Sequence, residues 1–334
     1  MNTPSSLPLS WLQSLLQDTQ LSQFELVQSL WSDFGQLLRC YSPARQASVI
    51  IKLISQPATF RHPRGWSSQH SLKRKWRSYE IEQYFYTYYA PLFAGHGNLA
   101  KLITSDAQNN ESETHLALVL SDLNAAGFEY RHQQLSASAC KPVLAWLAAF
   151  HARFIHQAPD GLWQQGSYWH LATRPDEFSK MAEGPLKQFG PAFDNTLQQC
   201  PYRTLIHGDA KVANFCFSAD GQAVAAVDFQ YVGGGIGVQD VAYFLGSVLS
   251  ERDLLKHTED CLDYYFRELR CALSKQLAPE ECEAVCNSRR QLYCVANADF
   301  HRFLAGWSPE HFKINRMLQQ QTEQAIALVS ARPQ

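Results

Sequence analysis

LIHGDAKVANFCFSADGQAVAAVDFQ, residues 205–230, is the stretch that decides the fold. It carries Asp209, then Asn214 five residues later, and then Asp228 beyond a hairpin whose predicted turn is at residues 219–221. Each aspartate follows a short apolar run. We therefore expect each carboxylate at the end of a strand, facing a cleft.

This set of polar groups matches the needs of metal-assisted phosphoryl transfer. That reaction uses a carboxylate to orient the attacking hydroxyl and accept its proton, and oxygen ligands to hold Mg²⁺ against the nucleotide phosphates. A lone Asp or Asn in a loop is usually a turn former. The joint spacing of Asp209, Asn214 and Asp228 favours catalysis over that simpler interpretation.

The N-terminal third of the chain reads as strands followed by a helix. Runs rich in β-forming residues at 24–30, 35–41 and 48–54 predict a three-stranded antiparallel sheet. A helix is predicted over residues 72–90, ending before a proline, and HLALVLSDL at 115–123 predicts one more strand.

Beyond residue 124 the apolar pattern becomes helical. Helical spacing marks the segments 143–157, 253–277, 281–304 and 313–329. The sequence thus predicts an α+β fold with a β-rich N-terminal lobe, residues 1–120, and a mainly helical lobe with an embedded hairpin, residues 121–334.

The motif HGDxxxxN at 207–214, followed by DFQ at 228–230, resembles the catalytic and metal loops of the protein-kinase-like small-molecule phosphotransferases. That superfamily holds the aminoglycoside phosphotransferases and choline kinases, and the Gln of DFQ is most similar to its ecdysteroid kinase-like branch. The resemblance implies a bilobal protein-kinase-like fold and transfer of the γ-phosphate of ATP, with Mg²⁺, to a hydroxyl of a small molecule. It implies Asp209 as the catalytic base and Asn214 and Asp228 as metal ligands.

Nucleotide-binding landmarks follow in the same order as in that superfamily. Lys52 resembles the third-strand lysine that binds the α and β phosphates, and Glu82 its partner on the following helix, with Glu80 as the competing partner. A lysine in an otherwise apolar strand is expected to be paired when buried. LALVLSDL resembles the hinge that binds adenine through its backbone, with Leu120 and Asp122 as the candidate contacts.

Two departures from the superfamily pattern concern the nucleotide. WSDFGQLL has only Gly35 where protein kinases carry GxGxxG, so contacts of a phosphate-covering loop are not assigned. The hinge reads SDL, with Ser121 in place of the branch's usual Glu. Because adenine is bound through backbone groups, this change is not expected to remove nucleotide binding.

The acceptor pocket has a weaker signature. Residues 161–177 are too irregular for a long helix and carry Trp163, Tyr168 and Trp169, which serve either as acceptor contacts or as core packing. Aromatic faces suit an apolar ring or a quaternary ammonium group. We expect an apolar or amphipathic alcohol first, a choline-like amine second and an aminoglycoside third.

Three further features have structural interpretations beside functional ones. His207 is expected to hydrogen-bond the metal loop, and GGGIG at 233–237 to be a flexible connection to a helix capped by Asp240. A stretch of basic residues without acidic ones either holds phosphate or an anionic substrate or forms a solvated surface. Its members are Arg61, Arg64, Lys73, Arg74, Lys75 and Arg77.

Composition narrows the function classes. Twenty-nine Lys and Arg against 31 Asp and Glu give a net charge of −2, which argues against a polycation that acts on nucleic acid. No uncharged apolar run reaches the ~18 residues of a membrane helix, and the first residues lack a basic region before an apolar one. The nine scattered cysteines lack a CxxC pair. We expect a cytoplasmic protein with reduced thiols, acting on a small-molecule alcohol, with no nucleic-acid or membrane partner.

Two classes of function stay open. One is a kinase of a small hydroxylated molecule, and the other is a kinase-like protein that binds nucleotide or ligand without turnover. Intact Asp209, Asn214, Asp228 and Lys52 favour the first, because an inactive kinase is expected to have lost at least one of them. A metal-dependent hydrolase using His207 is disfavoured, since no further His ligands lie near it in the sequence.

Overall fold

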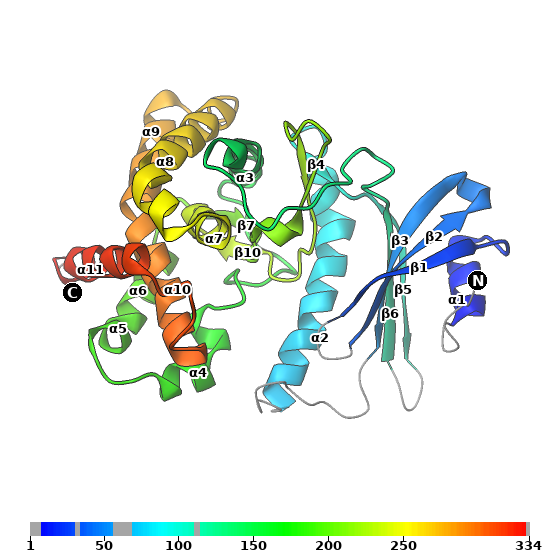
Figure 1. Cartoon of the computed structure of the whole chain (residues 1–334), viewed down its shortest axis with the longest axis horizontal. Coiled ribbons are helices and arrows are strands. Elements are labelled where there is room, and N and C mark those ends of the chain that lie inside the picture. The colour runs from blue at the N-terminus through cyan, green and yellow to red at the C-terminus, as the bar shows by residue number, and fades with distance from the viewer. Residues whose placement is uncertain (1–7, 31–33, 56–68, 110–113, 332–334) are drawn as a thin grey trace. The chain divides into compact units, whose positions relative to one another are not determined.

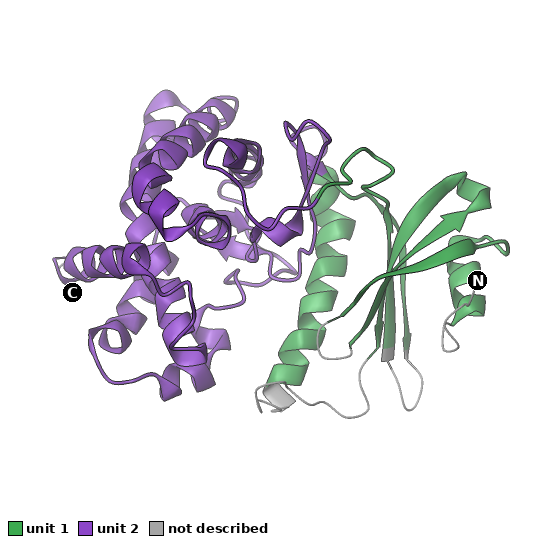
Figure 2. Cartoon of the chain, in the orientation of Figure 1, with its two compact units in different colours: residues 1–92, 99–130 green, residues 93–98, 131–334 purple. Residues whose placement is uncertain are grey.

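The computed structural model describes residues 8–30, 34–55, 69–109 and 114–331. The chain divides into two compact units (Figure 2). Unit 1 comprises residues 1–92 and 99–130, and unit 2 comprises residues 93–98 and 131–334.

Unit 1 is built on one five-stranded antiparallel sheet in the order β1-β2-β3-β6-β5. Its elements are α1 (Leu9–Leu16), β1 (Ser22–Ser29), β2 (Gly35–Ser42), β3 (Ala47–Ser55), α2 (Gln69–Tyr84), β5 (Leu102–Asn109) and β6 (Thr114–Ser121). The three predicted strands and the later fourth are confirmed. Strand β5 was not predicted, because LITSDAQN is largely polar and lies at the edge of the sheet.

Two helices cover opposite faces of this sheet (Figure 1). Trp11, Leu12 and Leu16 of α1 pack in a cluster with apolar side chains of β2, β3 and β6. Tyr79 of α2 packs with Ile54 in a second cluster. Side chains alternate between the faces of a strand, so Lys52 shares the α2 face with Ile54.

The helix predicted over residues 72–90 is confirmed. It begins as α2 and continues through a π-helical turn, η3 (Phe85–Tyr89), and a 3₁₀ turn, η4 (Ala90–Phe93). The buried aromatic side chains Phe85, Tyr86 and Tyr89 anchor this end of the helix.

Unit 2 is mainly helical, as predicted, and carries short strands at its centre. Its helices are α3 (Lys141–Arg153), α4 (Pro175–Lys180), α5 (Pro185–Gln188), α6 (Gly190–Gln198), α7 (Val238–Val248), α8 (Glu251–Leu273), α9 (Pro279–Gln291), α10 (Tyr293–Trp307) and α11 (Arg316–Ser330). The segment predicted as one helix, 281–304, is divided between α9 and α10 at Leu292. Within the ranges that the structure describes, no helix combines the length and apolar composition needed to cross a bilayer.

Two small strand pairs position the chemistry. β8 (Phe215–Phe217) and β9 (Val224–Ala226) form the predicted hairpin, and β7 (Thr204–Ile206) pairs with β10 (Gly233–Gly235). Asn98 of β4 (Asn98–Leu99) joins the hairpin through Nδ2, which donates to the carbonyl oxygen of Val224 at 3.4 Å.

The prediction that GGGIG is a flexible connection is wrong. Its three leading glycines form buried β10, paired residue by residue with β7. A Cβ on Gly233 would lie 2.2 Å from the carbonyl oxygen of Trp163, so only glycine lets the two backbones approach this closely. The segment is fixed by packing.

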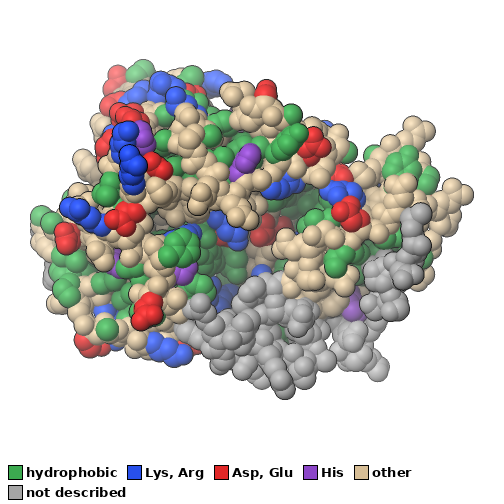
Figure 3. Space-filling view, in the orientation of Figure 1, with side chains coloured by type: hydrophobic (Ala, Val, Ile, Leu, Met, Phe, Trp, Pro, Cys, Tyr) green, Lys and Arg blue, Asp and Glu red, His purple; other side chains and the backbone are tan. Residues whose placement is uncertain are grey.

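The outer face of α8 and α9 mixes charges of both signs (Figure 3). Arg290 pairs with Glu259 and Asp263 at 2.7 Å, and Arg270 pairs with Glu283 at 3.0 Å. These exposed pairs contribute little stability, and they leave no single-signed patch on this face.

Candidate active site

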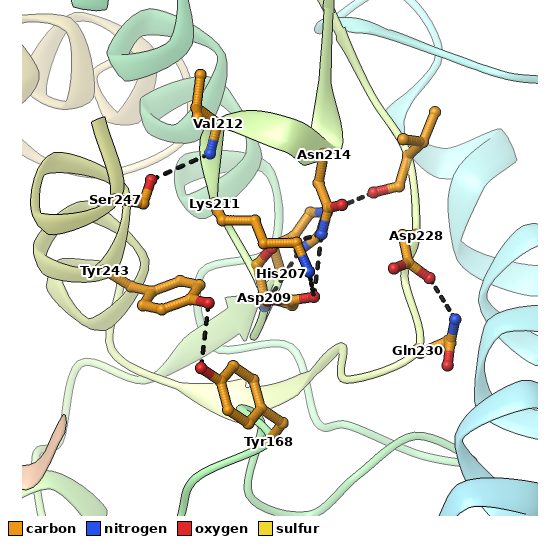
Figure 4. A network of polar contacts seen from close by, with 11 residues as sticks. Tyr168, His207, Asp209, Lys211, Val212, Asn214, Asp228, Gln230, Tyr243 and Ser247 are labelled. Atoms are coloured by element: carbon orange, nitrogen blue, oxygen red, sulfur yellow. Dashed lines mark hydrogen bonds and ion pairs between the residues drawn. The ribbon is translucent and has the colours of Figure 1, made fainter. Parts of the chain in front are cut away.

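Asp209 lies in the loop after β7, and its two carboxylate oxygens have different surroundings (Figure 4). Oδ2 accepts hydrogen bonds from Nζ of Lys211 at 3.0 Å and from Nδ2 of Asn214 at 3.1 Å. Oδ1 is buried and makes no hydrogen bond of ordinary geometry among the described residues, although the hydroxyl of Tyr243 is close enough to interact with the carboxylate. The loop therefore fixes one oxygen and leaves the other available.

Asp240 holds this loop from the first turn of α7. Its carboxylate accepts the backbone N–H of His207 at 2.6 Å, the N–H of Gly208 at 2.9 Å and Nε2 of His151 at 3.0 Å. The prediction that Asp240 caps the helix is wrong in detail, because Gly237 is the N-cap residue and Asp240 points to the loop. Its role is structural, as expected.

The buried pair of His151 and Asp240 uses a neutral imidazole. Burial lowers the pKa of His151 and outweighs the opposing effect of the Asp240 charge. Nε2 donates to Asp240, and Nδ1 accepts from the hydroxyl of Tyr265 at 2.9 Å. The Asp240 carboxylate thus accepts a hydrogen bond from His151 of α3 in addition to those from the backbone N–H groups of His207 and Gly208.

His207 joins the loop to the DFQ segment, as predicted. Its Nε2 donates to the carbonyl oxygen of Val227 at 3.0 Å, and its Nδ1 accepts the N–H of Asp209 at 3.3 Å. The N–H of Val227 in turn donates to the carbonyl oxygen of Asn214 at 3.0 Å. The two motifs are therefore held in register by hydrogen bonds.

Asn214 and Asp228 present oxygen atoms of the kind that Mg²⁺ prefers. The amide nitrogen of Asn214 donates to Asp209, including its carbonyl oxygen at 2.7 Å, and Oδ1 of Asn214 has no hydrogen bond among the described residues. Asp228 has a φ of +68°, in the left-handed region, and its Oδ1 accepts from Nε2 of Gln230. Figure 4 shows Asn214 bonded to Asp209, and Asp228 on the neighbouring DFQ segment beside Gln230. These side chains fit a hard divalent cation.

Lys211 is a site residue that the sequence analysis missed. Burial alone would lower its pKa, but the charges of Asp209 and Asp228 outweigh burial and raise it. The signal was present in the sequence, since Lys211 lies two residues after the catalytic candidate. Its ammonium group offsets the negative charge of both carboxylates.

Of the three predicted acceptor residues, Tyr168 lies in the neighbourhood of Asp209. Its hydroxyl donates to that of Tyr243 at 3.1 Å (Figure 4). Burial and the charge of Asp209 raise the pKa of both tyrosines. Tyr243, on α7, was not found from the sequence because its place depends on helix packing.

The two tryptophans are held by protein contacts. Trp163 donates from Nε1 to the carbonyl oxygen of Gln230 at 2.8 Å, and its ring stacks on Tyr231. Trp169 is 1% exposed and belongs to an apolar cluster with Tyr243 and other side chains. Trp169 is thus surrounded by core side chains.

The nucleotide-binding candidates lie in unit 1. Nζ of Lys52 on β3 lies 2.6 Å from Oε2 of Glu82 on α2, and both side chains are buried. Glu80 instead pairs with Arg77 at 3.0 Å, so Glu82 is the partner, as favoured from the sequence. This ion pair fixes the lysine on the α2 face of the sheet.

The segment after β6 is anchored by the side chain of Asp122. Its carboxylate accepts from Nε of Arg39 at 2.7 Å, Oγ of Ser48 at 2.8 Å and the N–H of Asn124 at 3.0 Å. Burial would raise the pKa of Asp122, but these hydrogen bonds lower it. The side chain of Leu120 is buried. The side chains of Leu120 and Asp122 are therefore both engaged in contacts within the protein.

Some predicted features fall partly outside the described residues. Arg61 and Arg64 of the basic stretch lie there, as do residues 31–33 of the WSDFG turn. Within the described part, Lys75 lies 4.7 Å from the centre of the Tyr79 ring.

Comparisons with known proteins agree with the predicted resemblance. The model of the ecdysteroid kinase-like family matches residues 168–277, the segment that contains both motifs. The resemblance is confirmed over that segment. A search among curated proteins finds no match.

Solved structures share the fold at low identity. An amicoumacin kinase in complex with AMP-PNP, Ca²⁺ and Ami is 13% identical, with a TM-score of 0.53 over 97% of this chain and 93% of that one. An aminoglycoside phosphotransferase, APH(4)-Ia, in a ternary complex with ADP and hygromycin B is 13% identical, with a TM-score of 0.52 over 98% and 99%. A microcompartment-associated aminopropanol kinase is 12% identical, with a TM-score of 0.51 over 96% of each chain. The fold is therefore that of the protein-kinase-like phosphotransferases.

Proposed function

We propose that this protein transfers the γ-phosphate of ATP, with Mg²⁺, to a hydroxyl group of a small molecule. The observation that carries the proposal is the asymmetry of the Asp209 carboxylate. Lys211 and Asn214 hold Oδ2, while Oδ1 is buried and makes no hydrogen bond of ordinary geometry among the described residues. A buried acceptor atom without a hydrogen bond is costly, so Oδ1 is suited to a donor that arrives with the substrate.

Asp209 orients the acceptor hydroxyl at Oδ1 and takes its proton there. The hydroxyl oxygen forms the new bond to the γ-phosphorus as the bond between that phosphorus and the bridging oxygen breaks. Lys211 contacts Oδ2 at 3.0 Å and holds that oxygen away from the acceptor. The backbone hydrogen bonds to Asp240 keep Asp209 in place during the reaction.

Asn214 and Asp228 would hold Mg²⁺, which when bound offsets the phosphate charge. In unit 1, Lys52 is proposed to bind the α and β phosphates, with Glu82 fixing its amine. The backbone around Leu120 and Asp122 is proposed to bind adenine. The use of ATP and a divalent metal is supported by solved proteins of the same fold, two of which are complexes with AMP-PNP and Ca²⁺ or with ADP.

The experiment is a transfer assay with γ-labelled ATP, purified protein and a panel of alcohols, run on the wild type and on Asp209→Asn. Loss of a general base typically lowers the rate by ~10²–10⁴. Affinity for MgATP is expected to stay within about twofold, because Oδ1 acts on the other substrate. Asp220→Asn, in the turn of the β8–β9 hairpin, is the matched control and is expected to behave as wild type.

Three outcomes would contradict the assignment. Wild-type turnover in Asp209→Asn would remove the base role from Asp209. Collapse of MgATP binding in the same variant would make Asp209 a metal ligand instead. A wild-type protein that binds MgATP but phosphorylates no alcohol would favour the kinase-like binding protein.

A further inference from the structure

The loop between α10 and α11, residues 308–315, extends the aromatic cluster of unit 2 to the surface. The ring of Phe303 stacks on Trp307 at 5.7 Å with an interplanar angle of 15°, and Trp307 lies 5.7 Å from His311. His311 stacks on Phe312 at 4.6 Å, and Phe312 is 81% exposed. An exposed aromatic side chain that continues a buried stack offers an apolar surface to a ring-containing molecule.

Lys313 follows this stack and is half-buried. Its amine lies over the faces of two rings, 5.0 Å from the centre of Tyr243 and 5.9 Å from that of Phe300. Within the described part of the chain, the amine makes no ion pair and no hydrogen bond. A partly desolvated cation without a carboxylate partner is suited to an anion supplied from outside the protein.

Lys313 is also within electrostatic reach of the catalytic loop. Its pKa is lowered to about 8, chiefly by burial, while the charge of Asp209 raises it and that of Lys211 lowers it. The ring beneath the amine, Tyr243, carries the hydroxyl that bonds Tyr168 beside Asp209 (Figure 4). An acceptor whose hydroxyl reaches Oδ1 of Asp209 is thereby brought near the amine.

Protein cations already cover the aromatic faces that a cationic acceptor would need. Besides Lys313, the guanidinium of Arg174 lies 5.6 Å from the centre of the Tyr168 ring and 5.2 Å from that of Phe303. Arg174 is itself neutralised by Glu177 at 3.0 Å. A quaternary ammonium group would have to displace these cations and would be repelled by Lys313. Choline-like amines and aminoglycosides are therefore poor candidates.

We infer that Lys313 binds an anionic group of the acceptor, and that the loop 308–315 selects hydroxylated ring compounds bearing a carboxylate. This inference rests on the proposed function for the presence of an acceptor. The stack that ends at Phe312 contacts the ring, Lys313 contacts the carboxylate, and Oδ1 of Asp209 takes the hydroxyl. Phosphoryl transfer to the acceptor hydroxyl is the same step as in the proposed function.

The test is an equilibrium binding measurement without nucleotide, using matched pairs of ring alcohols. Each pair is a carboxylate and its uncharged methyl ester, built on 4-(hydroxymethyl)benzoate, 4-hydroxycyclohexanecarboxylate and lithocholate. Hydrogen bonds to charged groups imply that the wild type binds the carboxylate of at least one pair about tenfold or more tighter than its ester. Lys313→Gln is expected to bring this ratio to about one, whereas Lys313→Arg retains it.

Two controls test whether the effect is specific to Lys313. One removes a lysine elsewhere on the surface, and the other guards against poor folding of Lys313→Gln. Lys256→Gln, on the exposed face of α8, is expected to keep the wild-type ratio. Lys313→Met provides a second neutral variant should Lys313→Gln fold poorly, since its apolar chain can occupy the same place over Tyr243.

Because binding is measured without nucleotide, failure of this inference differs from failure of the proposed function. A wild type that prefers the carboxylates through Lys313 but transfers no phosphate would refute the function and keep the anion site. The inference is overturned if no wild-type pair shows the preference, or if Lys313→Gln keeps it. It is also overturned if Lys313→Gln weakens MgATP binding by the same factor, because Lys313 would then serve the nucleotide.

Discussion

The segment 204–240 and the loop 308–315 lie in the same unit but are held in different ways. In the first, side chains such as Asp240 and His207 bond backbone groups and leave few polar atoms unpaired. In the second, stacked rings end at the exposed Phe312, and among the described residues the amine of Lys313 lies over the rings of Tyr243 and Phe300 without an ion pair. Side chains that hydrogen bonds hold in place suit the transfer step, which is the same for many acceptors. An exposed aromatic surface suits selection among those acceptors.

The largest effect is expected from a substitution that removes the hydrogen bonds holding the segment 204–240. Asp240→Ala leaves the N–H groups of His207 and Gly208 buried without an acceptor, at about 1–3 kcal/mol each. We expect a loss of about 2–5 kcal/mol in the free energy of unfolding, measured by urea denaturation. Asp263→Ala, which removes an exposed ion pair with Arg290, should cost less than about 1 kcal/mol. Equal losses in the two variants would show that Asp240 does not hold the loop.

An intermediate effect is expected at the proposed metal ligand in the same segment. Asn tolerates the positive φ of Asp228, so Asp228→Asn tests the charge without straining the backbone. We expect calorimetry to show MgATP binding weakened by about 10–100-fold, with the melting temperature close to that of the wild type. Unchanged MgATP affinity would remove Asp228 from the metal site.

The smallest expected effect lies in the loop 308–315 and depends on pH. Since burial lowers the pKa of Lys313 to about 8, its charge is largely present at pH 7 and largely lost at pH 9. The KM for a carboxylate-bearing acceptor should therefore rise about tenfold over that range, because the protonated fraction falls about tenfold. Lys313→Arg, which stays charged, should keep a flat profile. The same rise in both proteins would assign the titration to another group.

Short-range spacing was enough to predict that the candidate residues of the segment 204–240 lie together. His207, Asp209 and Asn214 lie within eight residues, so the loop geometry that joins them is local. Strands β1, β2, β3 and β6 of unit 1 were also predictable, since their apolar runs are β-rich and bounded by turn residues. The pairing of Lys52 with Glu82 followed because a buried lysine on an apolar strand needs a partner.

Other features depended on contacts between residues far apart in the chain. Helix α1 and strand β5 have weak local signals, and they exist because they pack on or pair with the rest of the sheet. GGGIG carried a loop-like composition, yet its lack of side chains is what allows β10 to pack against Trp163.

By itself, the sequence determined the class of fold and the contact between Asp209 and Asn214, because spacing within a short loop fixes which side chains can meet. Only the tertiary structure decided what holds and surrounds that loop. Asp240 reaches it from 31 residues beyond Asp209, and Lys313 comes within electrostatic reach from 104 residues beyond it. Contacts of this kind depend on how the helices pack, so no local sequence pattern predicts them.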